Sequence, residues 1–164
     1  HLVEQLLTLS RLETSIFQNR LSVEPVDWSS IANTLFYEYQ GRILQKHIKL
    51  QSSIASQGVI ANGDPTLCAL LLRNLLDNAL KYSPDSAELN LIITPEQISF
   101  SNSGVTLKTD DLAHLSERFY RPAGQTEQGS GLGLSIVRCI ADYYGCRLQI
   151  DCQDKIFTVT ITQS

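Results

Sequence analysis

The segment 64–83 constrains the fold more than any other part of this sequence. Asp64 is a preferred N-cap residue and Pro65 suits the first helical position, so the two predict a helix from about Pro65 to Tyr82. One side of this helix is apolar and consists of Leu72, Leu75, Leu76, Ala79 and Leu80. The other side carries polar residues at steps of three and four, which are Asn74, Asp77, Asn78 and Lys81. Such a helix buries one side in a core and leaves the other side for solvent or for a polar site.

The segments around this helix predict an α+β fold. Strand-like patterns occur at residues 48–54, 59–62, 89–94, 97–101, 147–151 and 156–162. Asp27 predicts the start of a second long helix with apolar residues as far as Leu44, and a third runs from Gly133 to about Tyr144, where Gly145 ends it. A short helix is expected near residues 110–116. Strands interleaved with three long helices predict a two-layer sandwich, in which a mixed, largely antiparallel sheet carries the helices on one face.

The first twenty residues are predicted to be distinct from the rest. Leucine and valine recur at helical spacing up to Leu12, and no capping residue precedes the pattern. This segment therefore has the pattern of the cut end of a longer helix, followed by a linker. We expect residues 1–20 to be that helix end and residues 21–164 to be a single domain, which is an ordinary size for one hydrophobic core.

Charge and cysteine content exclude several kinds of partner. A net charge of −4 and a pI near 5.3 provide no diffuse attraction to a polyanion, so we expect no nucleic-acid partner and a local site for any phosphate. The four cysteines show no C-x-x-C pair and no nearby histidine at metal-ligand spacing. They are expected to be reduced, structural thiols.

The polar stripe of the central helix suits magnesium and phosphate. Asparagine is a poor helix former, so two asparagines on one stripe lower helix stability unless their amides have another task. Mg²⁺ takes oxygen ligands and keeps several waters, so the amide oxygen of Asn78 together with nucleotide phosphates could hold it. Lys81 lies one turn further on as a positive charge for phosphate. The alternative interpretation is a solvated helix face.

A glycine-rich segment predicts a second phosphate-binding element. In GSGLGLSIV, residues 129–137, the glycines allow the backbone to approach an anion, and the N–H groups that open the following helix point toward it. The segment lacks the G-K-[ST] ending of a P-loop, and loop residues rather than a strand precede it, which excludes a dinucleotide-binding turn. The glycines therefore belong to another nucleotide-binding fold.

Three ordered segments resemble the sensor histidine kinases. Residues 73–83, RNLLDNALKYS, match that family's N box; residues 117–121, ERFYR, match its F box; and residues 129–137 match its G2 box. The run from Glu117 to Val137 also resembles the loop of the QseC-type quorum and stress sensors. The resemblance covers nearly the whole chain. It implies a Bergerat-type fold, in which ATP lies between the N-box helix and a mobile lid formed by residues 121–129.

The resemblance also implies the roles of individual residues. Asn74, Asn78 and Lys81 would serve Mg²⁺ and the phosphates, with Asn78 as the metal ligand, and Tyr82 would flank the adenine. Arg121 would reach phosphate oxygens, and Phe119 would anchor one end of the lid by hydrophobic packing. The bed beneath the phosphates would be formed by Gly129, Ser130, Gly131, Leu132 and Gly133.

One motif departs from the family pattern. The G1 box normally reads D-x-G-x-G, and its best match here is Asn102-Ser103-Gly104-Val105-Thr106. Asn102 can accept a hydrogen bond from the adenine amino group, but without the charge that makes such bonds roughly twice as strong. Thr106 adds a β-branched side chain where the backbone could need unusual dihedral angles. Weak ATP binding or a relaxed base preference is expected.

The implied function is that of an ATP-binding catalytic domain in a two-component sensor histidine kinase. It would donate the γ-phosphoryl group of ATP to a histidine on a dimerisation domain, for relay to a response regulator. That histidine lies in an H box, and His1, His47 and His114 lack the acidic neighbour of such a box. We therefore expect the chain to bind Mg²⁺-ATP without phosphorylating itself. The implied parent protein is a homodimer anchored in the bacterial inner membrane, with this domain in the cytoplasm.

Two alternatives remain open at this point. An ATPase of the gyrase or heat-shock chaperone kind shares the fold but uses an N-box glutamate to activate water, whereas this chain has Asn74, with Arg73 beside it. A nucleotide-regulated binding module with weakened or lost kinase activity would explain the altered G1 box.

Overall fold

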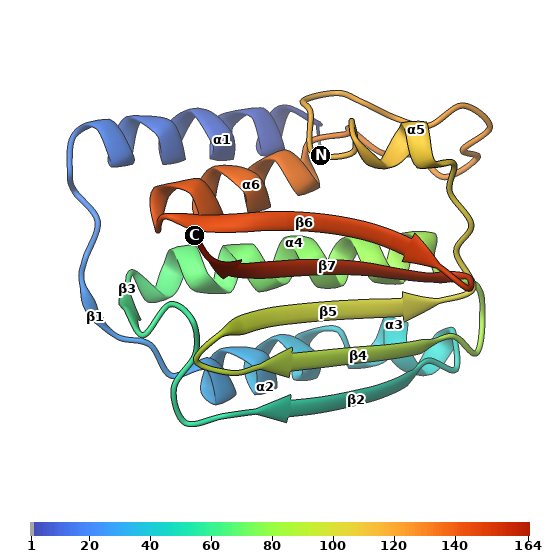
Figure 1. Cartoon of the computed structure of the whole chain (residues 1–164), viewed down its shortest axis with the longest axis horizontal. Helices are drawn as coiled ribbons and strands as arrows, with labels where there is room; N and C mark the ends of the chain where they lie inside the picture. Colours follow the sequence, from blue (N-terminus) through green and yellow to red (C-terminus); the bar gives the residue numbers. More distant parts are fainter. Residues whose placement is uncertain (1) are drawn as a thin grey trace.

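The computed structural model describes residues 2–164 and shows a five-stranded sheet covered on one face by helices (Figure 1). The strand order is β2 (Lys49–Ile54), β4 (Glu88–Ile93), β5 (Gln97–Ser103), β7 (Ile156–Gln163) and β6 (Cys146–Gln153). β2 and β4 are parallel, and the other neighbouring pairs are antiparallel. The parallel pair requires a long crossover, which the central helix supplies. The predicted mixed, largely antiparallel sheet is confirmed.

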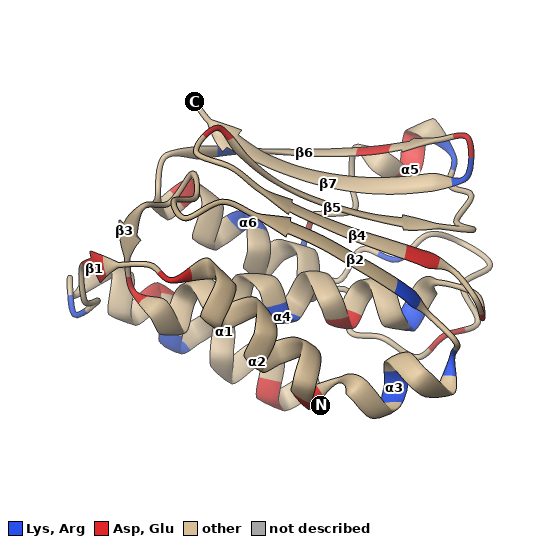
Figure 2. Cartoon of the chain, turned by 90° about the horizontal axis from the view of Figure 1, so that it is seen from below, with Lys and Arg blue, Asp and Glu red and all other residues tan. Residues whose placement is uncertain are grey.

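Three long helices form the second layer, as the sequence predicts. They are α2 (Trp28–Glu38), α4 (Pro65–Tyr82) and α6 (Gly133–Tyr143), with α4 between the other two (Figures 1 and 2). Two short helices, α3 (Gln40–Gln45) and α5 (Thr109–Leu112), lie in the connections. Figure 2 shows Lys and Arg scattered among Asp and Glu over the elements of both layers.

The N-terminal helix α1 (Leu2–Phe17) packs on the outer side of α6. Leu9 and Leu12 are buried in the same core cluster as the long helices, whereas Leu2, Val3, Leu6 and Leu7 stay exposed. His1 lies outside the described residues. Within the described part of the chain, no helix is both long enough and apolar enough to cross a bilayer.

Both ends of α4 are fixed by polar contacts from distant segments. The Asp64 side chain caps the helix by accepting from the N–H groups of Thr66 and Leu67. Burial alone would raise the pKa of Asp64, but the donors around it, Ser22 included, outweigh this effect and lower the pKa. At the other end, Lys46 Nζ donates to the carbonyl oxygens of Leu80 and Ser83 at 2.7 and 2.6 Å. The polar stripe of α4 is therefore held in one position along the sheet.

The predicted strand at residues 59–62 is wrong. Only Asn62–Gly63 pairs, as β3, with the two-residue strand β1 (Glu24–Pro25). Val59 and Ile60 are buried in the core, and the Ile60 carbonyl accepts from the indole N–H of Trp28 on α2 at 2.9 Å. Their hydrophobicity therefore reflects burial without a strand ladder.

The helix predicted to extend from Asp27 as far as Leu44 is interrupted. Tyr39 leaves the helical conformation with φ −91° and ψ 1°, so α2 and α3 are separate. The Tyr39 ring lies beside two guanidinium groups, with Arg42 at 5.5 Å and Arg73 at 5.8 Å from its centroid. Arg42 of α3 also pairs with Asp77 of α4, so α3 lies beside the polar side of α4.

The cysteines among the described residues are unpaired with one another, as predicted. Cys68 is fully buried on α4, and its burial raises the pKa of the thiol to about 12, an effect that the nearby Asp64 carboxylate reinforces. Such a thiol has little thiolate character and acts as a small apolar side chain.

Candidate functional site

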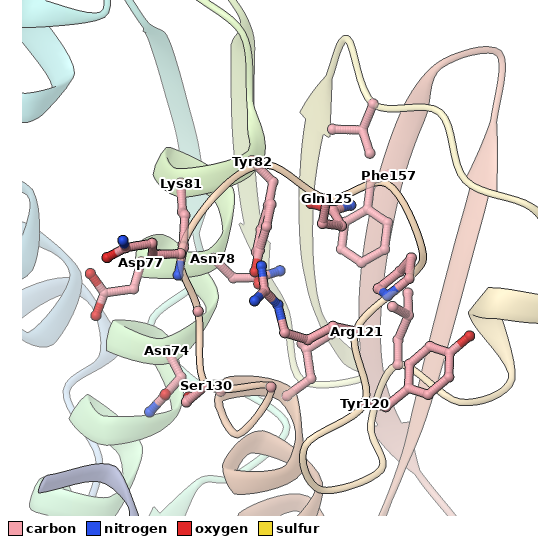
Figure 3. A pocket seen from close by; sticks show the side chains of 18 of the residues that line it. Asn74, Asp77, Asn78, Lys81, Tyr82, Tyr120, Arg121, Gln125, Ser130 and Phe157 are labelled. Carbon is pink, nitrogen blue, oxygen red and sulfur yellow. The ribbon is translucent and has the colours of Figure 1, made fainter. Parts of the chain in front are cut away.

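A cavity of about 350 Å³ opens between the polar side of α4 and the loop that precedes α6 (Figure 3). Of the twelve residues predicted for the site, ten line it: Asn74, Asn78, Lys81, Tyr82, Asn102, Arg121, Gly129, Ser130, Gly131 and Gly133. Segments far apart in the sequence therefore meet at one hollow. Gly104 and Leu132 do not line it.

Amide oxygens and cations gather on the α4 side of this cavity. Asn74 is buried, and its amide nitrogen donates to the Leu70 carbonyl at 2.8 Å. Its Oδ1 faces the first residue of α6, 3.5 Å from where a Cβ of Gly133 would lie. Asn78 and Lys81 follow along the same side. Amide oxygens for a hard cation, a lysine, and the N–H groups of a helix start for phosphate form a donor set that fits magnesium and a polyphosphate.

The lid loop, residues 121–129, lies across this donor set. The Arg121 guanidinium donates to the Glu127 carbonyl and points toward Tyr82 (Figure 3). A Cβ at Gly129 would lie 2.6 Å from Lys81 Nζ and 2.9 Å from the Tyr82 hydroxyl, so the loop backbone passes close to both side chains. The loop thus places a second cation, Arg121, opposite Lys81.

The predicted hydrophobic anchoring by Phe119 is wrong. Its side chain is 55% exposed, and its φ is +64°. The anchor is instead made by the backbone, because the Phe119 N–H donates to the Gly131 carbonyl at 3.0 Å. The next residue, Tyr120, adds a bond from its hydroxyl to Asp111 at 2.6 Å. The positive φ of Phe119 in this tight turn directs its ring outward, away from the core.

The far end of the cavity is apolar and contains Asn102 on β5. Its walls include Val105, Leu107, Leu115 and Phe157, and Asn102 itself is only 3% exposed. Such walls suit the faces of a flat base, and a single amide suits its polar edge. Gly104 and Thr106 lie at a second hollow beside the lid loop. Thr106 is exposed and has no positive φ, so the strain expected from its β-branched side chain is absent.

Comparison with known proteins agrees with this geometry. The profile of the histidine kinase-, DNA gyrase B-, and HSP90-like ATPase family matches residues 63–164. The chain belongs to this ATPase family.

Sensor proteins are among the similar proteins within the family. Sensor protein QseC of Salmonella typhi is 38% identical over 144 residues, and the match covers 88% of this chain and 32% of that protein. The swarming motility regulation sensor protein RssA of Serratia marcescens is 32% identical over 154 residues, which cover 91% of this chain and 32% of that protein. The solved structure of histidine kinase AdeS of Acinetobacter baumannii has a TM-score of 0.78 and 25% identity, covering 99% of this chain and 76% of that chain. The chain therefore spans about a third of the length of these curated relatives, and it shares the fold of the solved AdeS structure.

The structure adds cavity residues that sequence patterns did not single out. Arg42 reaches in from α3 and pairs with Asp77 of α4 at 3.0 Å. Gln5 of α1 accepts a hydrogen bond from the Ser130 hydroxyl at the glycine-rich turn. No local pattern marks either residue, because each depends on how a separate helix packs on this ATPase-family core. Phe157 could have been found from its alternation with Val159 and Ile161 on β7.

Lys81 is expected to make nucleotide binding depend on pH. Burial lowers the pKa of its ammonium group, and the nearby Arg121 adds to this effect, against opposing contributions from Glu127 and Asp77. A bound polyphosphate would raise that pKa again. Affinity should therefore be greatest at pH values below the Lys81 pKa in the free protein and should fall as pH rises through it.

Calorimetric titration with nucleotide from about pH 7 to about pH 10 measures this dependence. A Lys81→Arg variant is the control, because its guanidinium stays protonated throughout the range and the fall in affinity should disappear. An equally steep fall in that variant would assign the titration to another group.

Proposed function

We propose that this chain is the ATP-binding catalytic domain of a two-component sensor histidine kinase, which donates the γ-phosphoryl group of ATP to a histidine on a dimerisation domain. One observation carries the proposal. Asn78, Lys81, Arg121 and the N-terminal turn of α6 line one part of a cavity, and another part is apolar and includes Phe157, which pairs in the sheet with Asn102. One nucleotide could therefore place its phosphates at the polar part of the cavity and its base at the apolar part.

These residues would act mainly by positioning the phosphates and by stabilising the negative charge on them. The Asn78 oxygen would hold Mg²⁺, with the Asn74 amide beside it, and the metal would supply positive charge to the phosphates. Lys81 and Arg121 approach from opposite walls and would orient the terminal phosphate while neutralising charge that develops on its oxygens. The lid loop would exclude water from the transferred group.

The phosphate acceptor would come from outside the cavity. His114 is exposed and pairs with Glu117 at 2.8 Å, and neither His114 nor His47 lines the cavity. We assign the acceptor to the H box of a dimerisation domain, with α1 as the end of that domain's second helix. The proposed downstream partner is a response regulator. The proposed parent is a homodimer anchored in the inner membrane, with this domain on the cytoplasmic side.

Direct hydrolysis of ATP is the less favoured chemistry. The N-box position where gyrase-type ATPases place a glutamate is occupied by Asn74, whose amide cannot act as a base. Arg73 turns away to pair with Glu38 at 2.8 Å. Asp77 does line the cavity, but its carboxylate is already paired with Arg42 at 3.0 Å.

A binding module without kinase activity is also less favoured. Its motivation was the altered G1 box, yet Asn102 still lies at the apolar end of the cavity and Thr106 is unstrained. Both curated relatives named above are sensor proteins.

Two measurements test the proposal together. Calorimetry with a non-hydrolysable ATP analogue, with and without Mg²⁺, should show binding that depends on Mg²⁺. Radiolabelled ATP should then label a separately purified dimerisation domain that carries an H box, while the chain alone stays unlabelled. Label on the chain itself, or binding without any transfer to the added domain, would contradict the proposal.

A further inference from the structure

The polar group at the base end of the cavity is a neutral amide held by a hydroxyl group. Asn102 Nδ2 donates to Ser83 Oγ at 2.9 Å, and both residues are 3% exposed. Asn102 is fixed within β5, where it lies opposite Leu89 of β4 and Phe157 of β7. Ser83 is fixed as the C-cap of α4, and Lys46 holds its carbonyl. The backbone segments that carry the Asn102 amide and the Ser83 hydroxyl are therefore both held by contacts outside the cavity.

A hydroxyl group can satisfy either end of an amide. In the orientation seen, Ser83 accepts from the Asn102 nitrogen, and the amide oxygen remains for the cavity. If the amide rotates by half a turn, Ser83 donates to its oxygen, and the N–H₂ group faces the cavity instead. Both orientations keep one hydrogen bond to Ser83, so the protein favours neither strongly.

The two orientations match the two kinds of purine edge. An amide oxygen accepts from a 6-amino group, as in adenine, and an amide N–H₂ donates to a 6-oxo group, as in hypoxanthine or guanine. A carboxylate at position 102 could only accept, and it would face a 6-oxo group as two unpaired acceptors. Position 102 therefore decides which purines are rejected.

We infer that the base end of this cavity accepts 6-oxopurine nucleoside triphosphates as well as ATP, through rotation of the Asn102 amide against Ser83. The inference rests on the proposed function, since it assumes that the cavity holds a purine nucleotide. It names the base specificity of that site, which the family assignment leaves open.

Inosine triphosphate is the sharpest probe, because it differs from ATP only at the 6-position and the adjoining N1–H, and it has no 2-amino group to fit. Competition against a fluorescent ATP analogue in the presence of Mg²⁺ should place the affinities of ATP and inosine triphosphate within about 10-fold of each other. Guanosine triphosphate then reports whether the walls leave room for a 2-amino group. Rejection of inosine triphosphate by more than about 100-fold, with ATP still bound, would overturn the inference and leave the proposed function standing. A chain that binds no purine nucleotide would overturn both.

Two variants separate the amide from its surroundings. Asn102→Asp should tighten ATP and weaken inosine triphosphate, so that the ratio of their affinities changes by about 100-fold in favour of ATP. Ser83→Ala should weaken both nucleotides and leave their ratio near that of the original chain, because either amide orientation loses its partner. Ser83→Thr keeps the hydroxyl group and should restore both affinities. An unchanged ratio in a folded Asn102→Asp variant would show that position 102 does not read the base.

Discussion

Replacing Asn78 with alanine should lower the affinity for Mg²⁺-nucleotide by about 100-fold and should not destabilise the fold. Asn78 lines the cavity on α4, and its amide oxygen is the proposed magnesium ligand. Alanine removes that oxygen, but it is also the better helix former by a few tenths of a kcal/mol. Affinity and unfolding free energy should therefore change in opposite directions. Calorimetry with and without Mg²⁺, beside urea denaturation, measures both.

The matched control is Asn33→Ala on α2. Asn33 is exposed on a helix and does not line the cavity, so the same chemical change should leave nucleotide affinity unaltered. If Asn78→Ala still binds nucleotide with full dependence on Mg²⁺, the metal is held elsewhere and the role proposed for the α4 stripe is wrong.

Gly131→Ala should detach the lid loop from its anchor and lower nucleotide affinity by about 10- to 100-fold. Gly131 has φ +71°, which is costly for a residue with a side chain by about 1–2 kcal/mol. In addition, its new Cβ would lie 2.7 Å from the Phe119 carbonyl carbon and 2.8 Å from the Tyr120 oxygen, both of them backbone atoms. The hydrogen bond from Phe119 to the Gly131 carbonyl would then be lost or lengthened. Titration with an ATP analogue and limited proteolysis of the loop would report the change.

Gly124→Ala isolates the effect of the dihedral angle alone. Gly124 lies in the lid loop with φ +85°, but nothing lies within 4 Å of where its Cβ would be. The Gly124→Ala variant should therefore have the conformational penalty without the steric clash. Its nucleotide affinity should fall clearly less than that of Gly131→Ala. Equal effects from the two substitutions would mean that the contact between Gly131 and Phe119 does not anchor the loop.

Elements that depend on short-range chemistry were predictable from the sequence. Helix α4 begins and ends at the expected residues because its N-cap, its first-turn proline and its apolar stripe all lie within the helix or beside it. The polar cavity residues of α4 followed from the same pattern. Gly145, which has a positive φ, also marked the end of α6. The predicted last residue, Tyr144, differs by one from the observed last residue, Tyr143.

Features that depend on packing were not predictable in this way. Val59 and Ile60 have the composition of a strand, but their neighbours in space leave them no ladder to join. Phe119 has an apolar side chain, yet the turn that closes on Gly131 directs it to solvent. Arg42 lines the cavity from α3, which is separate from α2 because Tyr39 leaves the helical conformation. Each outcome was decided by a residue distant in sequence or by one backbone angle.

The mixed connectivity of the sheet has a consequence for how the chain acquires and loses its binding site. The cavity combines α4 with β5, β7 and the lid loop, and the parallel strands β2 and β4 are connected through α4. Non-local pairings of this kind are slow to form in folding because loop closure precedes their gain in contacts. A partly folded chain therefore has no assembled cavity, and nucleotide stabilises the native state alone, by an amount that grows with the logarithm of its concentration. The population of unfolded chain available to proteases would thus fall as the nucleotide supply rises.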